Sequence, residues 1–192
     1  MTEIALEMSD EELVKKYTPV IEKIMADSLR FFRFGQGVRW KFDFLENLAY
    51  RAHYNYNEDG VHVNIYSVHF ANERNEPLSI EFWLLHELRH RFQRFIVRAG
   101  DRGGDVGADI EEAKIWKNEW ADYKKPVSRD EKSLAEYSKQ SVEFDANVYA
   151  YAVMQYKYGD IPYLKDCIPK CYGKGFYKKA DEWCQWFREM GI

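Results

Sequence analysis

The sequence predicts one α+β domain, in which a small three-stranded antiparallel sheet is packed with an HExxH helix and several further helices. The chain has 192 residues, enough for a single domain with a substantial core. Hydrophobic residues make up 46% and aromatic residues 17%, a composition typical of a folded globule. Apolar residues recur at helical spacing over most of the chain and alternate with polar ones mainly between residues 38 and 68.

The N-terminal elements begin with a helix over residues 10–32. Ser9 and Glu12 have the spacing of a capping box at its start. The pair Thr18-Pro19 predicts a restart, since threonine can cap a helix and proline can occupy its first position. Strands are predicted at residues 38–44, 48–56 and 61–68. These strands are expected to pair in chain order as an antiparallel meander.

The rest of the chain is expected to be mainly helical. Helices are predicted at about residues 77–99, 109–124 and 128–159, with a break near 140–141, and at the C-terminus after a loop-like stretch that begins at 160. No internal repeat or linker interrupts the chain, so residues 1–192 are expected to form a single domain.

Charge and cysteine content narrow the classes of function. The formal net charge of −4 gives no global attraction to nucleic acid or anionic lipid. No secretory signal and no apolar run of membrane-spanning length is visible, so a cytoplasmic protein without a membrane partner is expected. Cys167, Cys171 and Cys184 are expected to be reduced thiols, with a metal site built on the first two as the alternative.

The string HELRH at residues 86–90 lies within one predicted helix. Residues four apart share a helical face, so His86 and His90 can both bind one ion at about 2.0–2.1 Å. Glu87 is close enough to act on a water at that ion without ligating it. The alternative is a pair of partly exposed histidines on an amphipathic helix.

A catalytic zinc site needs a third protein ligand. The metzincin pattern fails, because Gln93 and Ile96 occupy its glycine and third-histidine positions. A downstream carboxylate is expected instead, and the stretch EFDANVYAYAVM from Glu143 offers one. Together with HELRH, this stretch resembles the gluzincin zinc peptidases, most closely the ImmA/IrrE-like group. The similarity covers roughly residues 10–158 and leaves the C-terminal extension 159–192 outside.

The resemblance implies that His86, His90 and Glu143 ligate Zn²⁺, with Glu87 as the general base. It also implies that Asn147, four residues after Glu143 on the same helical face, accepts a hydrogen bond from a ligand histidine.

Asp145 competes with Glu143 as the third ligand. Residues two apart on a helix point about 200° apart, so both cannot face the metal. Asn147 favours Glu143, and Asp145 is expected to point away. Three further glutamates are weaker alternatives: Glu111, Glu112 and Glu136.

The expected function is hydrolysis of a peptide bond by a zinc metallopeptidase, with Glu87 moving a proton from water to the leaving amine. The partner is a protein or peptide substrate, or a regulatory protein, and no oligomeric state is predicted. Candidate donors to the oxyanion are His69, Tyr137, Tyr149 and Tyr151.

Two other functions remain open. One is a catalytically inactive, zinc-stabilised binding domain. The other is nucleic-acid binding through a stripe of Arg91, Arg94 and Arg98, with Arg89 and Arg102 nearby. The acidic net charge argues against nucleic acid as a partner.

Overall fold

The computed structural model describes residues 8–32, 37–101, 110–125 and 131–192. It divides into two compact units, Met1–Leu84 and Leu85–Ile192, and the boundary falls inside one long helix. The single domain expected over the whole chain stays a prediction. Within the described ranges, no helix combines the length and apolarity needed to cross a membrane.

The first unit is an α+β assembly. It contains α1 (Asp10–Phe32), β1 (Arg39–Asp43), β2 (Ala52–Asn55), β3 (Gly60–Asn64), α2 (Ile65–Glu73) and the first part of α3 (Pro77–Asp101). The capping box at Ser9 is confirmed, because its backbone nitrogen and hydroxyl both donate to Glu12. The predicted restart at Pro19 is wrong, since α1 runs through this residue without a break.

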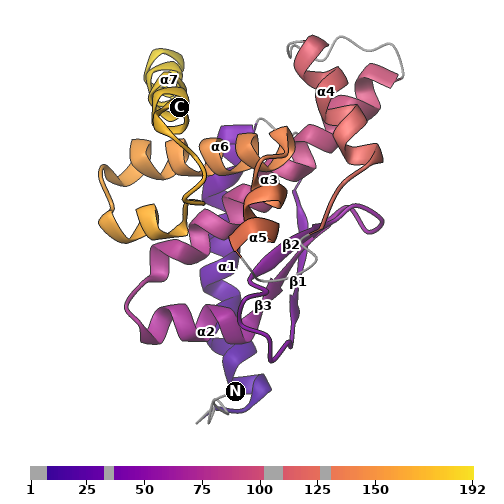
Figure 1. Ribbon diagram of the computed structural model, residues 1–192. Helices are drawn as coiled ribbons and strands as arrows, with labels where there is room; N and C mark the ends of the chain where they lie inside the picture. Colours follow the sequence, from indigo (N-terminus) through magenta and orange to yellow (C-terminus); the bar gives the residue numbers. More distant parts are fainter. Residues whose placement is uncertain (1–7, 33–36, 102–109, 126–130) are drawn as a thin grey trace. The chain divides into compact units, whose positions relative to one another are not determined.

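The sheet is mixed rather than antiparallel, and its strands do not pair in chain order. β3 lies between the other two strands, parallel to β1 and antiparallel to β2 (Figure 1). The expected meander is therefore wrong. The loop from β1 to β2 is held by Asn64, whose amide nitrogen donates to the carbonyls of Leu45, Asn47 and Tyr50. These bonds organise the loop from residue 44 to 51, part of which was expected to be strand.

Asn64 also ends β3 earlier than predicted. Its side chain accepts a hydrogen bond from the backbone nitrogen of Tyr66 and so caps α2. Residues 65–68, expected as strand, are the first turn of this helix. Helix α2 packs on α1, where the Tyr17 hydroxyl lies 2.9 Å from Nδ1 of His69.

The second unit is helical and is built around α6. It contains the remainder of α3, α4 (Ile110–Ala121), α5 (Glu131–Ser138), α6 (Ser141–Tyr158), a 3₁₀ turn (Pro162–Cys167) and α7 (Lys174–Met190). The predicted break near residues 140–141 separates α5 from α6 and is confirmed. Helix α6 contacts α4, α5 and α7, which explains why it is buried from Val142 to Met154 with little interruption.

The N-terminus of α6 is fixed by a carboxylate from α4. Glu119 accepts hydrogen bonds from the backbone nitrogens of Ser141 and Val142 and from the Ser141 hydroxyl. A carboxylate at the N-terminal end of a helix accepts hydrogen bonds from N–H groups that have no partner within the helix. Its negative charge also interacts favourably with the positive end of the helix dipole. The first turn of α6, which carries Glu143, is thereby held in place.

Candidate metal centre

Helix α3 presents the two histidines of HELRH on one face. The Nε2 atoms of His86 and His90 lie 3.0 Å apart, and the two rings meet edge to face. The Trp120 indole and the His90 ring form a T-shaped contact, with 5.3 Å between their centroids. His90 is buried, whereas His86 keeps 13% of its side chain exposed. The pair therefore points both nitrogens toward one position near the surface of the second unit.

Glu143 completes the cluster from the first turn of α6. Its carboxylate oxygens lie 3.4 Å from Nε2 of His86 and 3.2 Å from Nε2 of His90. Four ligands arranged tetrahedrally at zinc bond lengths are roughly 3.3 Å apart. The 3.4 Å contact is made by Oε2 of Glu143 and the 3.2 Å contact by Oε1, and together with the 3.0 Å between the histidine nitrogens each separation is close to this spacing. The donor set of two imidazoles and a carboxylate also suits zinc.

The charges of the cluster support one another. Burial alone would lower the pKa of His90, but the Glu143 carboxylate and the nearby Glu87 outweigh it and raise this pKa to about 9. Burial alone would raise the pKa of Glu143, yet His90 and His86 hold it well below its ordinary value. Glu143 is therefore an anion at neutral pH although only 1% of its surface is exposed. A buried anion between two histidines can bind a cation strongly.

Gln93 fixes the tautomer of His90. Its amide nitrogen donates to the Val142 carbonyl and to the Asp145 carboxylate, which are both acceptors. Its amide oxygen therefore faces Nδ1 of His90, at 2.9 Å, and that nitrogen must carry a hydrogen. Once His90 is neutral, Nε2 has a free electron pair directed at the cluster.

Tyr123 and Tyr137 hold the carboxylate of Glu143. The Tyr123 hydroxyl donates to Oε1 of Glu143 and lies 3.0 Å from the Tyr137 hydroxyl. Because a carboxylate only accepts, the single hydrogen of Tyr123 goes to Glu143, and Tyr137 donates to Tyr123. Burial and the Glu143 charge raise the pKa of both tyrosines well above the ordinary value. Both hydroxyls are therefore protonated at neutral pH.

Asp145 points away from the cluster, as expected from its position on α6. Its carboxylate forms two hydrogen bonds, of 2.8 and 3.0 Å, with the Arg89 guanidinium. Both side chains are buried. Aromatic rings surround the guanidinium carbon at 4.3 to 5.5 Å: Phe92, Trp116, Tyr149 and Trp183. This ion pair joins α3 to α6 on the side opposite Glu143.

Asn147 does not make the contact that the resemblance implies. Its amide nitrogen donates to the backbone carbonyl of Glu143 and to the Tyr172 hydroxyl. Gln93, rather than Asn147, accepts the hydrogen bond from a ligand histidine, namely His90. Asn147 ties the first turn of α6 to the segment that precedes α7.

Glu87 follows His86 on α3 and is half buried. Its charge contributes to the raised pKa values of His90, Tyr123 and Tyr137. Its carboxylate therefore acts electrostatically on the same cluster, without belonging to the group of ligand atoms.

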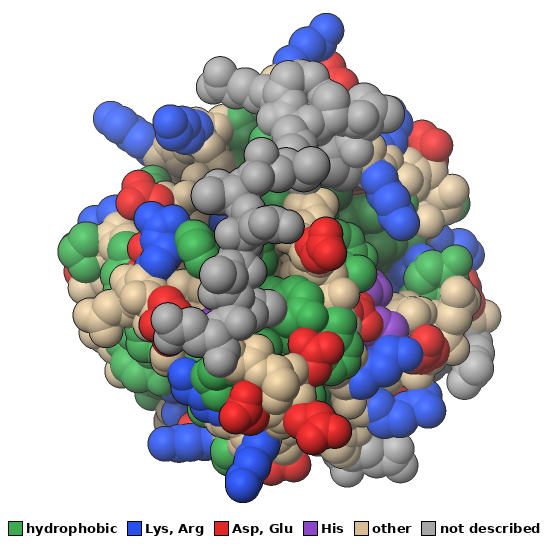
Figure 2. Space-filling model, turned by 90° about the horizontal axis from the view of Figure 1, so that it is seen from below, with side chains coloured by type: hydrophobic (Ala, Val, Ile, Leu, Met, Phe, Trp, Pro, Cys, Tyr) green, Lys and Arg blue, Asp and Glu red, His purple; other side chains and the backbone are tan. Residues whose placement is uncertain are grey.

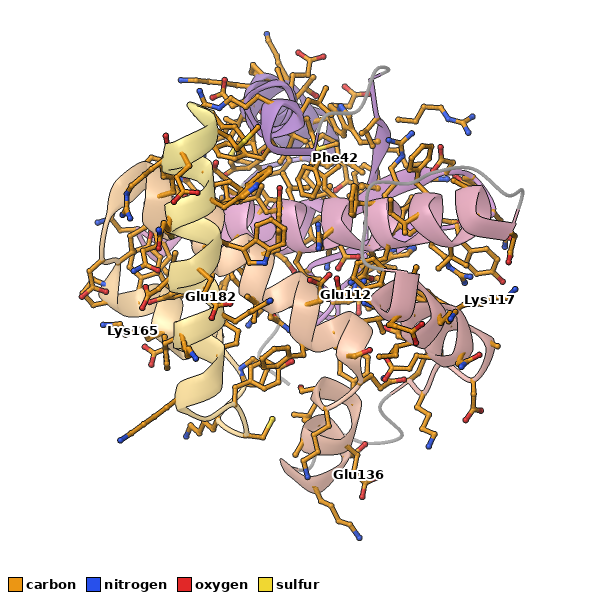
Figure 3. The ribbon with its side chains drawn as sticks, turned by 90° about the horizontal axis from the view of Figure 1, so that it is seen from above. Phe42, Glu112, Lys117, Glu136, Lys165 and Glu182 are labelled. Carbon is orange, nitrogen blue, oxygen red and sulfur yellow. The ribbon has the colours of Figure 1, made fainter. Side chains whose placement is uncertain are left out.

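Most other candidates lie away from this cluster. Among the proposed oxyanion donors of the second unit, Tyr137 is linked to Glu143 through Tyr123, whereas Tyr149 packs against Trp183 and Tyr151 packs against Phe176. His69 belongs to the first unit. Glu111 and Glu136 are exposed, and Figure 3 shows Glu136 projecting outward from α5. The charge of Glu112 acts on Arg89. None of these three glutamates belongs to a metal-binding group in the described ranges.

Only part of the arginine stripe is exposed to solvent, where it could contact a nucleic acid. Arg89 is buried against Asp145, and the Arg94 guanidinium stacks on Trp120 at 4.3 Å. Arg91 is half buried, Arg98 is exposed, and Arg102 lies outside the described residues. On the face drawn in Figure 2, Lys and Arg side chains are interspersed with Asp and Glu side chains. The described residues thus give little support to a continuous basic surface.

The three cysteines are free thiols, and none belongs to a metal-binding group among the described residues. Cys184 is buried on α7, where its thiol donates to the Ala152 carbonyl. Cys171 is exposed and Cys167 is half buried.

A comparison of the chain with protein-family models, with curated proteins and with solved structures finds no match.

Proposed function

We propose that this protein is a zinc metallopeptidase in which His86, His90 and Glu143 hold the ion and Glu87 is the general base. The observation that carries the proposal is the cluster of His86, His90 and Glu143, in which the Nε2 atoms lie 3.0 Å apart and each lies 3.2 to 3.4 Å from an oxygen of the Glu143 carboxylate. Two histidines on one helix and a glutamate on a later one are also the ligands of the gluzincins. Membership of the ImmA/IrrE-like group is part of this proposal.

Held by His86, His90 and Glu143, a zinc ion would supply a water of lowered pKa and would polarise the scissile carbonyl. The Glu87 carboxylate would then accept the proton of this water and deliver it to the leaving amine. Gln93 keeps Nδ1 of His90 protonated, so that this histidine offers Nε2 throughout. Tyr123 and Tyr137 keep the Glu143 carboxylate in one orientation.

A cytoplasmic location belongs to the same proposal. Three free thiols suit a reducing compartment.

The proposal is tested with the zinc-loaded full chain and a mixture of unstructured peptides, followed by mass spectrometry. Cleavage that requires zinc and disappears in Glu87→Gln is expected, because the amide keeps the shape of the side chain but cannot accept a proton. Glu182→Gln is the matched control, since this glutamate lies exposed on α7 (Figure 3). It should cleave like the wild type.

Two outcomes would overturn peptidase activity. Full cleavage by zinc-loaded Glu87→Gln would exclude Glu87 as the general base. Zinc binding that raises the melting temperature, with no peptide cut by the wild type, would indicate the zinc-stabilised binding domain instead.

A further inference from the structure

A second group of metal-ligating side chains lies on the sheet of the first unit. Asp43 comes from β1, His53 from β2 and His62 from β3. His53 is directly opposite His62 in the antiparallel pair. In the parallel pair, Lys41 is opposite His62, and Asp43 lies two residues further along the same face. Each strand thus contributes one side chain to a common position.

We propose that Asp43, His53 and His62 form a second binding site, for a divalent transition-metal ion of the zinc class. The proposal does not depend on the peptidase function, because the two clusters share no residue.

The distances within this group are close to those that zinc requires. Oδ2 of Asp43 lies 3.3 Å from Nδ1 of His62 and 3.8 Å from Nδ1 of His53. The two imidazole rings meet edge to face at 4.6 Å between centroids. Ligand atoms of tetrahedral zinc are roughly 3.3 Å apart, so one separation already matches and the other is about half an ångström longer. Asp43 and His53 are only partly buried, which gives the carboxylate and the ring room to turn.

Glu58 prepares His62 to act as a ligand through Nδ1. Nε2 of His62 lies 3.1 Å from a carboxylate oxygen of Glu58, and the same oxygen forms an ion pair with Nζ of Lys41 at 2.8 Å. Because the Lys41 ammonium pairs with this oxygen, Glu58 faces His62 as a carboxylate. Since an ionised carboxylate only accepts, Nε2 carries the hydrogen, and neutral His62 has its electron pair on Nδ1. A carboxylate behind a metal-binding histidine is the usual arrangement.

The donors identify the class of ion. Two imidazoles and one carboxylate suit Zn²⁺, Ni²⁺ or Cu²⁺, whereas Ca²⁺ and Mg²⁺ need more oxygen ligands. Three protein ligands leave a further position for water. His53 keeps 31% of its side chain exposed, so an ion can enter from solvent. With one ligand from each strand, the bound ion would cross-link the whole sheet and stabilise the first unit.

The experiment counts zinc bound to the metal-free full chain by competition with a chromophoric chelator. The wild type is expected to bind two ions and His90→Ala one. The double variant His90→Ala with Asp43→Asn should bind none at micromolar zinc. Asp59→Asn, which removes a charge from the turn between β2 and β3, is the matched control and should not change the count. Far-UV circular dichroism of each metal-free variant verifies that it is folded.

Glu58→Gln provides a second measurement that spares all three ligands. Half of the Glu58 side chain is exposed, so the exchange is compatible with the fold. Loss of the carboxylate behind His62 should weaken zinc at this site about 10–100-fold in the His90→Ala background. The proposal is overturned if His90→Ala binds no zinc, if Asp43→Asn leaves its remaining ion in place, or if Glu58→Gln does not change its affinity. If only the HELRH site fails to bind zinc, the wild type should still bind one ion at Asp43, His53 and His62.

Discussion

The Nδ1 nitrogen of His90 lies 2.9 Å from the amide oxygen of Gln93, one turn further along α3. Since the amide nitrogen is committed to Val142 and Asp145, the direction of this hydrogen bond is determined. The contact links the buried ion pair of Arg89 and Asp145 to the histidine that faces Glu143.

Replacing this glutamine tests that relationship. Gln93→Leu removes the acceptor for Nδ1, so His90 can lose its orientation and its tautomer. We expect about 10–100-fold weaker zinc binding at the HELRH site, measured by chelator competition in the Asp43→Asn background. Gln155→Leu, on α6 and bonded to Asp181, is the control and should bind zinc normally. Equal affinity in both variants would contradict the role of Gln93.

Glu143 and Asp145 can be separated by a matched pair of substitutions. Glu143→Gln should remove zinc from the HELRH site at micromolar free metal, because only two strong ligands remain. Asp145→Asn should keep this zinc, since Gln93 still donates to Val142. It should lower the free energy of unfolding by about 3–5 kcal/mol, because Arg89 is left as a buried charge without its counter-ion. Zinc titration and urea unfolding of both variants measure these effects. Loss of zinc in Asp145→Asn, with zinc retained in Glu143→Gln, would contradict the assignment of Glu143 as the ligand.

The tyrosine that holds the carboxylate is expected to matter as well. Tyr123→Phe deletes the hydroxyl that donates to Glu143, so zinc affinity or activity should fall about 10–100-fold. Tyr151→Phe, whose ring packs against Phe176 and Tyr177, should leave both unchanged. A Tyr123→Phe enzyme with wild-type zinc affinity and wild-type kcat/KM would exclude this role.

Zinc binding should depend on pH through His90. In the metal-free protein its pKa is about 9, since the Glu143 charge outweighs burial, and its proton must leave when zinc binds. Apparent zinc affinity should rise about tenfold per pH unit from pH 7 to about 9. Calorimetry in buffers of different ionisation heat measures the released proton, and an affinity independent of pH would contradict this assignment.

The raised pKa of His90 also contributes to the stability of the metal-free fold. This contribution is fully present below about pH 6.5 and is lost as the pH rises through about 9.

Helical periodicity predicted that Glu143 and Asp145 point to different sides of one helix, and the family resemblance, with Asn147 on the same face as Glu143, assigned Glu143 to the side of His86 and His90. It could not identify Gln93, because the partners that orient its amide lie 49 and 52 residues away in the chain. Tyr123 was missed for the same reason, since its bond to Glu143 depends on how α4 and α6 pack.

The sheet was mispredicted because pairing in chain order was assumed. Asn64 was the available signal, since asparagine favours the N-cap of a helix and so the end of a strand. Its three bonds to the preceding loop, which leave β1 beside β3, are long-range contacts that a local pattern does not contain.

The central claim is that His86, His90 and Glu143 hold zinc, and anomalous diffraction at the zinc edge from zinc-loaded crystals tests it most directly. We predict a peak about 2.0–2.1 Å from Nε2 of both histidines and in bonding contact with the Glu143 carboxylate. Zinc-loaded crystals with no anomalous peak among these three side chains would contradict the claim.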